Sequence, residues 1–308
     1  MAKSPNKFEI TDMQNTLVNV NGEILPAAQA QVSIFDRGFL YGDSLYEVMR
    51  SHNGKLMHLK EHLIRLEASA KLCRMVLGQS TDIYAQEIEK TFTAFLKMSG
   101  HAQTEAYCRL IVTRGVGKIG FGLNCLKSPT QYFIIVQPLE LPTAAQFEKG
   151  MAIQVAARLR NDPRALDPAM KSGNYLNSLL AYLEATAEDY DDAIMLNHQG
   201  HVTEGTTFNI FYVHKNIVIT PPLDIGILDG ITRLEVLREA KTLGFETREA
   251  RFPKERLYEA DEVFVTSTIR EVFPVTSIDR KSIAGGRPGS VTRKLKDAYK
   301  KSIEQNIS

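Results

Sequence analysis

The sequence predicts a two-domain protein of mixed α+β and α/β structure. The chain has 308 residues, roughly twice an ordinary domain of about 150, and 44% of them are hydrophobic, which is enough to fill two cores. Strand-like and helical patterns alternate densely along it. The weakly periodic stretch 138–143 carries two prolines and predicts a connection between the halves. We therefore expect a small N-terminal α+β domain at 1–137, a linker at 138–146 and a larger, sheet-rich domain at 147–308.

The first domain is expected to start with short strands and to continue with two helices. The dipeptide Asn21-Gly22 between two alternating apolar runs is a hairpin signal. Apolar residues every three or four positions from Leu59 to Cys73 predict an amphipathic helix over 59–77, and a second helix is expected over 84–98. The predicted strands are 16–20, 23–26, 32–35, 45–49 and 131–136.

The second domain is expected to alternate strands with two longer helices. One helix is predicted over 176–190, with Leu179, Leu180 and Leu183 on one face, and another over 233–243. The turn 197–200 separates two apolar runs and predicts a hairpin. The predicted strands are 151–156, 193–196, 201–203, 209–213, 217–219 and 262–268.

Charge and cysteine content exclude several classes of protein. With 37 basic and 36 acidic residues the net charge is +1, so we expect small-molecule partners rather than nucleic acid or a membrane surface. Cys73, Cys108 and Cys125 form no CxxC pair or His-rich cluster, so neither a disulfide framework nor a metal site is expected. The N-terminus lacks an apolar signal core, and no run approaches the roughly 18 apolar residues of a membrane span. We therefore expect a cytoplasmic protein.

Chemistry is expected around Lys171, which together with Gly173 and Tyr175 follows a proline-containing loop and precedes an apolar helix. A lysine that is desolvated or set beside another cation loses its proton easily, so it can present a neutral amine to a carbonyl group. The other interpretation is a solvated surface lysine, which is the common situation.

Three further motifs each have two interpretations. Gly230-Ile231-Thr232 stands where a loop becomes a helix, so its N–H groups either donate to a phosphate or begin a helix that threonine caps. Thr266-Ser267-Thr268 ends a strand and either donates to an anion or turns the chain. Glu204 precedes a glycine after a strand, which fits either a half-buried carboxylate paired with a cation or a solvent-facing acid.

These motifs together match one cofactor, because a lysine, a carboxylate for a ring cation and two anion-accepting turns are what pyridoxal phosphate requires. Their order resembles that of the fold-type-IV, or class IV, pyridoxal-phosphate-dependent aminotransferases. This family includes branched-chain amino acid aminotransferases, D-amino acid aminotransferases and aminodeoxychorismate lyase. The resemblance spans about residues 16–296 and implies the fold of that family and pyridoxal 5'-phosphate as the cofactor.

The resemblance implies three roles around the cofactor ring. Lys171 forms the Schiff base and moves a proton between the α-carbon of the substrate and the C4′ atom of the cofactor. Tyr175 donates to the phenolic oxygen of the ring. Glu204 keeps the pyridine nitrogen protonated, and each pKa unit by which it does so is worth about 1.4 kcal/mol.

The resemblance also implies how the phosphate and ring are held. Arg65 is the expected phosphate cation, although it lies in a polar helical row with His58, Glu61, His62 and Ser69 that also fits a solvated arginine. The other expected cofactor contacts are Leu228 beneath the ring, the N–H groups of Ile231 and Thr232, and the hydroxyl-rich turn at Ser267 and Thr268.

The substrate side resembles branched-chain aminotransferases, whose tyrosines and arginines line the pocket and bind the distal carboxylate of glutamate or 2-oxoglutarate. The expected substrate contacts are Tyr41, Tyr46, Arg50, Tyr107, Arg109, Thr268 and Ile269.

The stereochemistry of the substrate stays open. The turn Thr113-Arg114-Gly115 is not followed by the Arg-x-His of D-amino acid aminotransferases, which favours the L-specific branch. Yet Tyr46-Glu-Val and Thr266-Ser-Thr-Ile-Arg270 look more like the D-specific group, and Val48 and Arg270 depart from the branched-chain pattern. A D-amino acid aminotransferase, an aminodeoxychorismate lyase and a non-catalytic cofactor-binding protein are therefore the alternatives.

The function expected from the resemblance is a ping-pong transaminase acting between a branched-chain or other apolar L-amino acid and 2-oxoglutarate. The resemblance further implies a homodimer with active sites near the subunit interface, where residues 35–46 reach the neighbouring pocket.

Overall fold

A computed structural model of the chain describes residues 13–101 and 103–307, so the N-terminal segment examined for a signal core lies outside the described residues. The chain divides into two compact units. The first holds residues up to Glu67 together with Met75–Leu139, and the second holds Ala68–Arg74 together with the residues from Glu140 onward. The short segment 68–74 thus belongs with the second unit, which the sequence pattern did not indicate.

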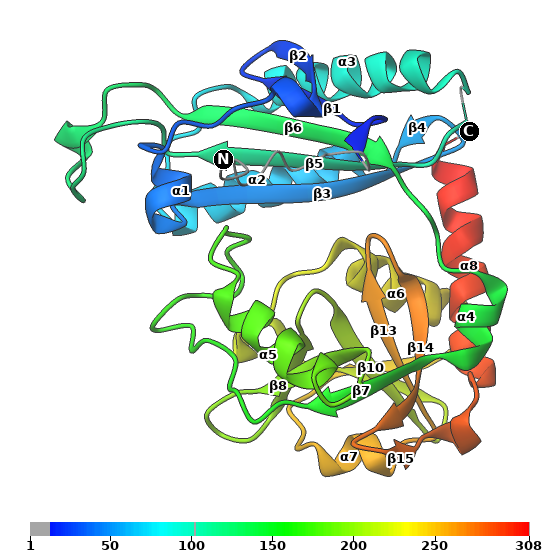
Figure 1. Cartoon of the computed structure of the whole chain (residues 1–308). Coiled ribbons are helices and arrows are strands. Elements are labelled where there is room, and N and C mark those ends of the chain that lie inside the picture. Colours follow the sequence, from blue (N-terminus) through cyan, green and yellow to red (C-terminus); the bar gives the residue numbers. More distant parts are fainter. Residues whose placement is uncertain (1–12, 102, 308) are drawn as a thin grey trace, which may run out of the picture. The chain divides into compact units, whose positions relative to one another are not determined.

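The first unit is built on a six-stranded antiparallel sheet with the strand order β2-β1-β6-β5-β3-β4. Asn21 and Gly22, both at positive φ, join β1 to β2 and confirm the predicted hairpin. Figure 1 shows α3 along one face of this sheet. The elements that lie wholly in this unit are β1 (Leu17–Val20), β2 (Glu23–Pro26), α1 (Arg37–Tyr41), β3 (Ser44–His52), β4 (Lys55–Leu56), α3 (Thr81–Ser99), β5 (Ala106–Thr113) and β6 (Gln131–Pro138). Helix α2 (Leu59–Leu72) begins in this unit, and its residues from Ala68 onward are counted with the second unit.

Two predictions for the first half are corrected by the structure. Residues 32–35 form no strand, because Val32, Ile34 and Phe35 are exposed and this stretch pairs with no strand of the described residues. The helix predicted over 59–77 ends at Leu72, and the residue Arg74 just beyond has a positive φ that a helix does not tolerate.

The second unit is built on a nine-stranded mixed sheet with the order β12-β11-β10-β13-β14-β7-β8-β9, and β15 pairs with β14. Figure 1 shows α5 beside β8, and α6 and α8 beside β13 and β14. The strands are β7 (Met151–Val155), β8 (Asp192–Leu196), β9 (Val202–Gly205), β10 (Asn209–His214), β11 (Ile217–Thr220), β12 (Glu246–Glu249), β13 (Glu262–Ser267), β14 (Glu271–Ile278) and β15 (Lys281–Ser282). The helices are α4 (Ala144–Lys149), α5 (Leu176–Thr186), α6 (Ile231–Thr242), α7 (Glu255–Tyr258) and α8 (Ser290–Ile307).

Helix α4 begins inside the stretch 138–146 that was expected to be a linker. Thr143 caps it: the hydroxyl of Thr143 accepts the N–H of Gln146, and the side chain of Gln146 accepts the N–H of Thr143. This reciprocal capping starts a helix without the hydrophobic periodicity on which the prediction relied.

Helix α5 buries its small residues rather than its leucines. Ala181 and Ala185 are fully buried in a cluster with Ala156, Ala193 and Met195, because only small side chains let the helix approach β8 closely. Leu179 and Leu183 lie on one face, as predicted, but that face is about half exposed.

Two further findings concern membranes and thiols. Every helix within residues 13–101 and 103–307 is too short or too polar to span a bilayer. Cys73, Cys108 and Cys125 are all thiols, and burial raises the pKa of Cys108 to about 12.

Candidate active site

Lys171 lies in the turn that precedes α5, in the second unit. It is half-buried rather than exposed, so it is not the fully solvated lysine of the alternative interpretation. Its backbone N–H donates to the hydroxyl of Ser69 (3.1 Å), and Ser69 is itself buried. Tyr175 is the N-cap of α5, directly before its first residue Leu176. The lysine and the tyrosine are therefore fixed by a helix start on one side and by Ser69 on the other.

Glu204 lies on the buried strand β9 and is 5% exposed, so its interpretation as a solvent-facing acid is wrong. The guanidinium of Arg160 donates to Oε1 through Nε (3.0 Å) and Nη2 (2.9 Å). The N–H of Leu228 donates to Oε2 (3.0 Å), and the amide of Asn209 lies 3.4 Å from the same oxygen. The carboxylate is thus charge-compensated and held on both oxygens.

Arg160 also joins Glu204 to the beginning of α5. Its Nη1 donates to Oδ1 of Asn177 (3.3 Å), two residues after Tyr175. Neither Arg160 nor Asn209 was singled out in the sequence. Both stand in polar stretches typical of surface loops and strand starts, and their pairing with Glu204 is visible only in the folded chain.

The turn Leu228–Gly230 leads into α6, whose first residue is Ile231 rather than the expected Arg233. Gly230 is the N-cap and no side chain caps this helix, so the idea that a threonine caps it is wrong. Ile231 and Thr232 are buried in the first turn. The N–H groups at this helix start suit an anion, because they carry the positive end of the helix dipole.

The hydroxyl groups of Thr266 and Ser267, at the end of β13, have different surroundings. The oxygen of Ser267 accepts the N–H of Arg270 (3.0 Å), so this hydroxyl turns the chain. Thr266 is 1% exposed, and its Oγ1 has no hydrogen-bond partner among residues 13–101 and 103–307. Thr268 and Ile269 follow in the turn and are half-buried.

These features of the second unit fit pyridoxal phosphate. The uncapped start of α6 suits the phosphate, and the buried carboxylate of Glu204 suits a protonated ring nitrogen. The buried hydroxyl of Thr266, unpaired within the described part of the chain, is a polar atom for which a bound ligand is a natural partner.

Arg65, in the first unit, is held by a carboxylate that the sequence analysis overlooked. Its Nε and Nη2 donate to the two oxygens of Glu47 (2.9 and 2.6 Å), and its side chain is 12% exposed, so it is not a solvated arginine. His62 Nδ1 donates to Glu47 from the other side (2.7 Å). The sequence held one signal for the group of Glu47, His62 and Arg65, namely a glutamate among the apolar residues of a strand. That glutamate was interpreted only as part of a resemblance to the D-amino acid aminotransferases.

The buried trio has strongly shifted ionisation. Burial by itself would raise the pKa of Glu47, but the charge and hydrogen bonds of Arg65, with His62, lower it to about 2. Burial lowers the pKa of His62 to about 4, and the nearby Glu47 opposes this only in part. Near neutral pH the trio is therefore a carboxylate, a neutral imidazole and a guanidinium.

The first unit also holds most residues expected at the substrate, on α1, β3 and β5. The guanidinium of Arg109 lies over the ring of Tyr46, 4.1 Å from its centroid. Tyr107 and Arg50 are opposite each other in the β3–β5 register. Arg50 is only 2% exposed, and its Nε donates to the sulfur of Met57 (3.3 Å), so it is a core residue of this sheet.

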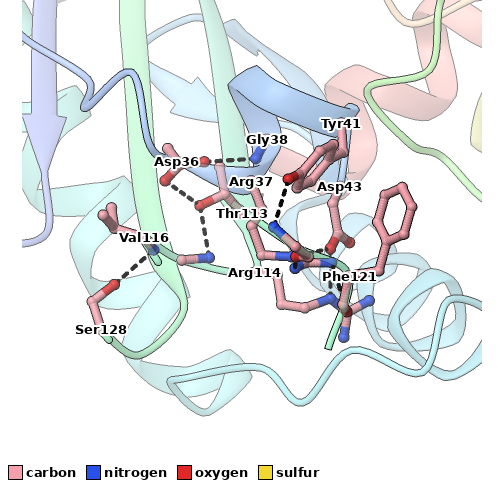
Figure 2. Close-up of polar contacts among 12 residues, drawn as sticks. Asp36, Arg37, Gly38, Tyr41, Asp43, Thr113, Arg114, Val116, Phe121 and Ser128 are labelled. Atoms are coloured by element: carbon pink, nitrogen blue, oxygen red, sulfur yellow. Dashed lines mark hydrogen bonds and ion pairs between the residues drawn. The ribbon is translucent and has the colours of Figure 1, made fainter. Parts of the chain in front are cut away.

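Tyr41 is held at a junction between α1 and the loop after β5, which Figure 2 shows. Its hydroxyl accepts the N–H of Gly120 (3.1 Å). Arg37 and Arg114 both donate to Asp43 (2.9 and 2.8 Å), which ties the two segments together. The arginine of the Thr113-Arg114-Gly115 turn is thereby engaged within the first unit.

Arg270, one of the two departures from the branched-chain pattern, is engaged within the second unit. Its Nη2 lies 3.2 Å from the buried carboxylate of Asp192, and its Nη1 donates to Thr207 (3.3 Å). Burial raises the pKa of Asp192, although hydrogen bonds from Thr206 and Arg270 oppose the rise. Val48, the other departure, lies on β3 between Glu47 and Met49 and is half-buried.

A lysine held before a helix, a buried carboxylate with its cation and an uncapped helix start are together what a pyridoxal-phosphate enzyme requires. Residues 44–278 match the model of the amino-transferase class IV family, so the chain belongs to this family. Class IV aminotransferases use pyridoxal phosphate, and the protein is a transaminase of this class.

Relatives and solved structures agree with the family. The chain is 38% identical over 284 residues to a Methanocaldococcus jannaschii protein that bears the provisional name branched-chain-amino-acid aminotransferase, covering 92% of this chain and 95% of the relative. It is 34% identical to the branched-chain-amino-acid aminotransferase of Escherichia coli K12, covering 91% and 90%. The T.th. branched-chain amino acid aminotransferase complexed with N-(5'-phosphopyridoxyl)-L-glutamate superimposes with a TM-score of 0.83 at 30% identity, covering 94% of both chains.

These comparisons confirm the resemblance drawn from the sequence, the fold-type-IV fold and pyridoxal phosphate as the cofactor. They also exclude the non-catalytic interpretation, because the matching family model is that of class IV amino-transferases and the relatives bear aminotransferase names.

Proposed function

We propose that this transaminase moves an amino group between a branched-chain or other apolar L-amino acid and 2-oxoglutarate. The observation that carries the proposal is the similarity, over about nine tenths of the chain, to proteins named branched-chain aminotransferases. The pair of Arg109 and Tyr46 supports it, because a ping-pong enzyme must take an apolar and a carboxylated side chain in one pocket. The aromatic ring suits the first and the guanidinium suits the second.

The proposed chemistry is centred on three residues of the second unit. Pyridoxal phosphate, when bound, supplies the electron sink for the electrons left when the α-proton of the amino acid is removed. Lys171 is proposed to hold the cofactor through its Nζ until the amino group of the substrate takes its place. The freed Nζ would then take the α-proton and deliver it to the C4′ atom of the cofactor within the same half-reaction, and the second half-reaction would run in reverse. Tyr175 is proposed to donate to the phenolic oxygen, and Glu204 to keep the ring nitrogen protonated.

The phosphate of the cofactor is proposed to be bound by backbone and side-chain hydrogen-bond donors. The N–H groups of Ile231 and Thr232 and the hydroxyl of Thr268 are the proposed phosphate donors, and Leu228 is proposed to pack against the ring. Ser267 contributes by turning the chain at Thr268. From the first unit, Arg65 is the proposed phosphate cation, and Glu47 holds its guanidinium in one orientation.

The substrate contacts remain proposals as well. Tyr41, Tyr46, Tyr107 and Arg109 are proposed to line the substrate side from the first unit, and Thr268 and Ile269 from the second. Arg50 is proposed to act through the packing of β3, because its side chain is buried in the sheet.

A substrate panel in both enantiomers tests the function. With 2-oxoglutarate as the acceptor, we expect glutamate to form from L-leucine, L-isoleucine and L-valine and not from D-alanine. The measurement is the initial rate of glutamate formation, with reactions lacking 2-oxoglutarate as the control. Turnover of D-alanine alone would establish the D-amino acid aminotransferase instead. Release of pyruvate from aminodeoxychorismate would establish the lyase.

We also propose that the protein is a homodimer, on the basis of an apolar patch in the first unit. The patch consists of Ile34, Phe35 and Phe39 near α1, and Ile119, Phe121 and Leu123 in the adjacent loop; the two segments are joined by the hydrogen bond of Gly117 N–H to Phe35 O. Phe39 and Phe121 are 72% and 80% exposed. Such clustering of large apolar side chains is typical of an interface, and a second copy of this chain is the proposed occupant.

Sedimentation velocity tests the dimer. The wild-type protein is expected to sediment with twice the mass of the chain, and the double variant Phe39→Asp and Phe121→Asp as a monomer. Val76→Asp is the matched control, because Val76 is 85% exposed in the same unit but lies outside the patch. A monomeric wild-type protein at micromolar concentration would refute the dimer.

A cytoplasmic location is proposed because all three cysteines are thiols, as is usual in a reducing compartment. Fractionation of the source cells would test it.

A further inference from the structure

We infer that Asn209 is a positioning residue that couples the carboxylate of Glu204 to the helix start at Gly230. Asn209 is the first residue of β10 and is 4% exposed. The inference rests on the proposed function, because Glu204 and the start of α6 are the proposed contacts of the ring nitrogen and the phosphate. It adds a residue that sets the distance between those two contacts.

The side-chain amide of Asn209 faces both partners. Its Nδ2 donates to the carbonyl of Leu228 (3.0 Å) and lies 3.4 Å from Oε2 of Glu204. An amide nitrogen carries two hydrogens, so it can serve both acceptors. The N–H of Leu228 donates to the same oxygen of Glu204 (3.0 Å). Asn209, Leu228 and Glu204 therefore form a closed ring of three contacts.

The carbonyl end of the same side chain fixes the helix start. A Cβ atom placed on Gly230 would lie only 2.0 Å from Oδ1 of Asn209. Gly230 has an ordinary φ of −74°, so a glycine is needed here for space and not for its backbone angle. Asn209 thus packs directly against the backbone from which α6 begins.

The backbone connecting Glu204 and Asn209 is itself constrained. Gly205 donates its N–H to the carbonyl of Phe208 (2.9 Å), and a Cβ atom on Gly205 would lie 2.1 Å from the Phe208 ring. On its other side, Asn209 is opposite Thr266 in the β10–β13 register. The side chain therefore has a fixed origin from which to span the carboxylate and the turn.

Arg160 and Asn209 act on Glu204 in different ways. Arg160 contacts Oε1 and supplies charge, whereas Asn209 contacts Oε2 and is neutral. Removing the amide leaves the charge of the site unchanged but releases the link between Oε2 and the turn. The expected defect is one of geometry, and it falls on the binding of the ring and the phosphate together.

Cofactor affinity of the apoprotein tests the inference without relying on turnover. Asn209→Ala is expected to raise the Kd for pyridoxal 5'-phosphate about tenfold or more, the effect of losing a hydrogen bond to a charged group. Thr220→Val is the matched control: Thr220 is equally buried in the adjacent strand β11 and donates to the carbonyl of Ile210, with no contact to Glu204. Thr220→Val is expected to lower the free energy of unfolding and to leave the Kd for pyridoxal 5'-phosphate at the wild-type value. Equal Kd values for Asn209→Ala and the wild-type protein would refute the inference.

A double-mutant cycle and an isosteric variant separate positioning from general destabilisation. If Asn209 acts through Glu204, the combination of Asn209→Ala with Glu204→Gln raises Kd little more than Glu204→Gln alone; additive losses would refute this. Asn209→Asp keeps the shape beside Gly230 but replaces the donor with a second carboxylate. Its Kd is expected to approach the wild-type value as the pH falls from 8 to 6, because a protonated acid can donate again. A deficit independent of pH would indicate packing alone and overturn the coupling through the amide.

Failure of the proposed function would look different. It would appear in the wild-type protein as the absence of a borohydride-reducible adduct at Lys171, whatever the behaviour of Asn209.

Discussion

Lys171→Ala is expected to lower the rate of transamination by at least about 10³-fold, because the variant would lack the amine proposed to hold the cofactor and to move the α-proton. Positioned proton transfer alone contributes about 10²–10⁴-fold in enzymes. The measurement is the initial rate with the best L-amino acid of the substrate panel. Borohydride reduction followed by peptide mapping is expected to place a pyridoxyl label on Lys171 of the wild-type protein and none on the variant.

The matched control is Lys241→Ala, which removes an exposed lysine from the far end of α6. This variant is expected to keep the wild-type rate and the label on Lys171. A label on another lysine, or full activity of Lys171→Ala, would refute the assignment of the reactive amine.

Glu47→Gln is expected to lower the free energy of unfolding by about 3–5 kcal/mol, the typical cost of breaking a buried ion pair. Glu47 is completely buried, and its removal leaves the guanidinium of Arg65 without its carboxylate partner. The measurement is urea unfolding of the protein. If Arg65 binds the phosphate, the variant is also expected to bind pyridoxal phosphate less tightly, because the guanidinium is no longer oriented.

The same trio predicts a pH dependence of stability. The pKa of His62 falls from its ordinary 6.5 to about 4. Between pH 6.5 and 4 the imidazole is therefore protonated in the unfolded chain and neutral in the native state. The pKa of Glu47 falls from 4.5 to about 2, with the same sign at lower pH. Both residues therefore contribute to the free energy of unfolding at neutral pH. The contribution of His62 is lost as the pH falls from 6.5 to 4, and that of Glu47 as it falls from 4.5 toward 2.

The pH dependence has its own variant and control. His62→Gln is expected to flatten the loss of stability between pH 6.5 and 4, whereas His198→Gln removes an exposed histidine and is expected to leave it unchanged. A wild-type protein with constant stability over this range would contradict the buried neutral imidazole.

The sequence was sufficient for the class of enzyme because its motifs combine residue types that the chemistry needs in a recognisable order. Glu204 and Gly230 were predicted in this way, and the structure places one on a buried strand and the other at an uncapped helix start. The partners that orient these residues were not predicted. Arg160 lies 44 positions from Glu204 in the sequence, and Glu47 lies 18 from Arg65. Such pairings depend on the register of strands, which no local pattern encodes.

Two segments differ from what their sequence patterns suggested, the stretch 32–35 and helix α5. Val32 and Ile34 alternate with polar residues as in a strand, but alternation predicts a strand only where a neighbouring strand is available to pair with it. The leucines of α5 were the apolar residues that the sequence made prominent, whereas close approach to β8 buries the alanines. In both places the folded environment, and not the intrinsic preference of the segment, decided the outcome.

The seven residues 68–74 have a practical consequence for anyone who wishes to divide this enzyme. A fragment cut at the proline stretch and starting at residue 147 would leave behind Ser69, whose hydroxyl accepts the peptide hydrogen of Lys171 from 102 positions away. The backbone at Lys171 is therefore held by a segment that is synthesised about a hundred residues earlier, and the C-terminal portion alone would lack that hydrogen bond.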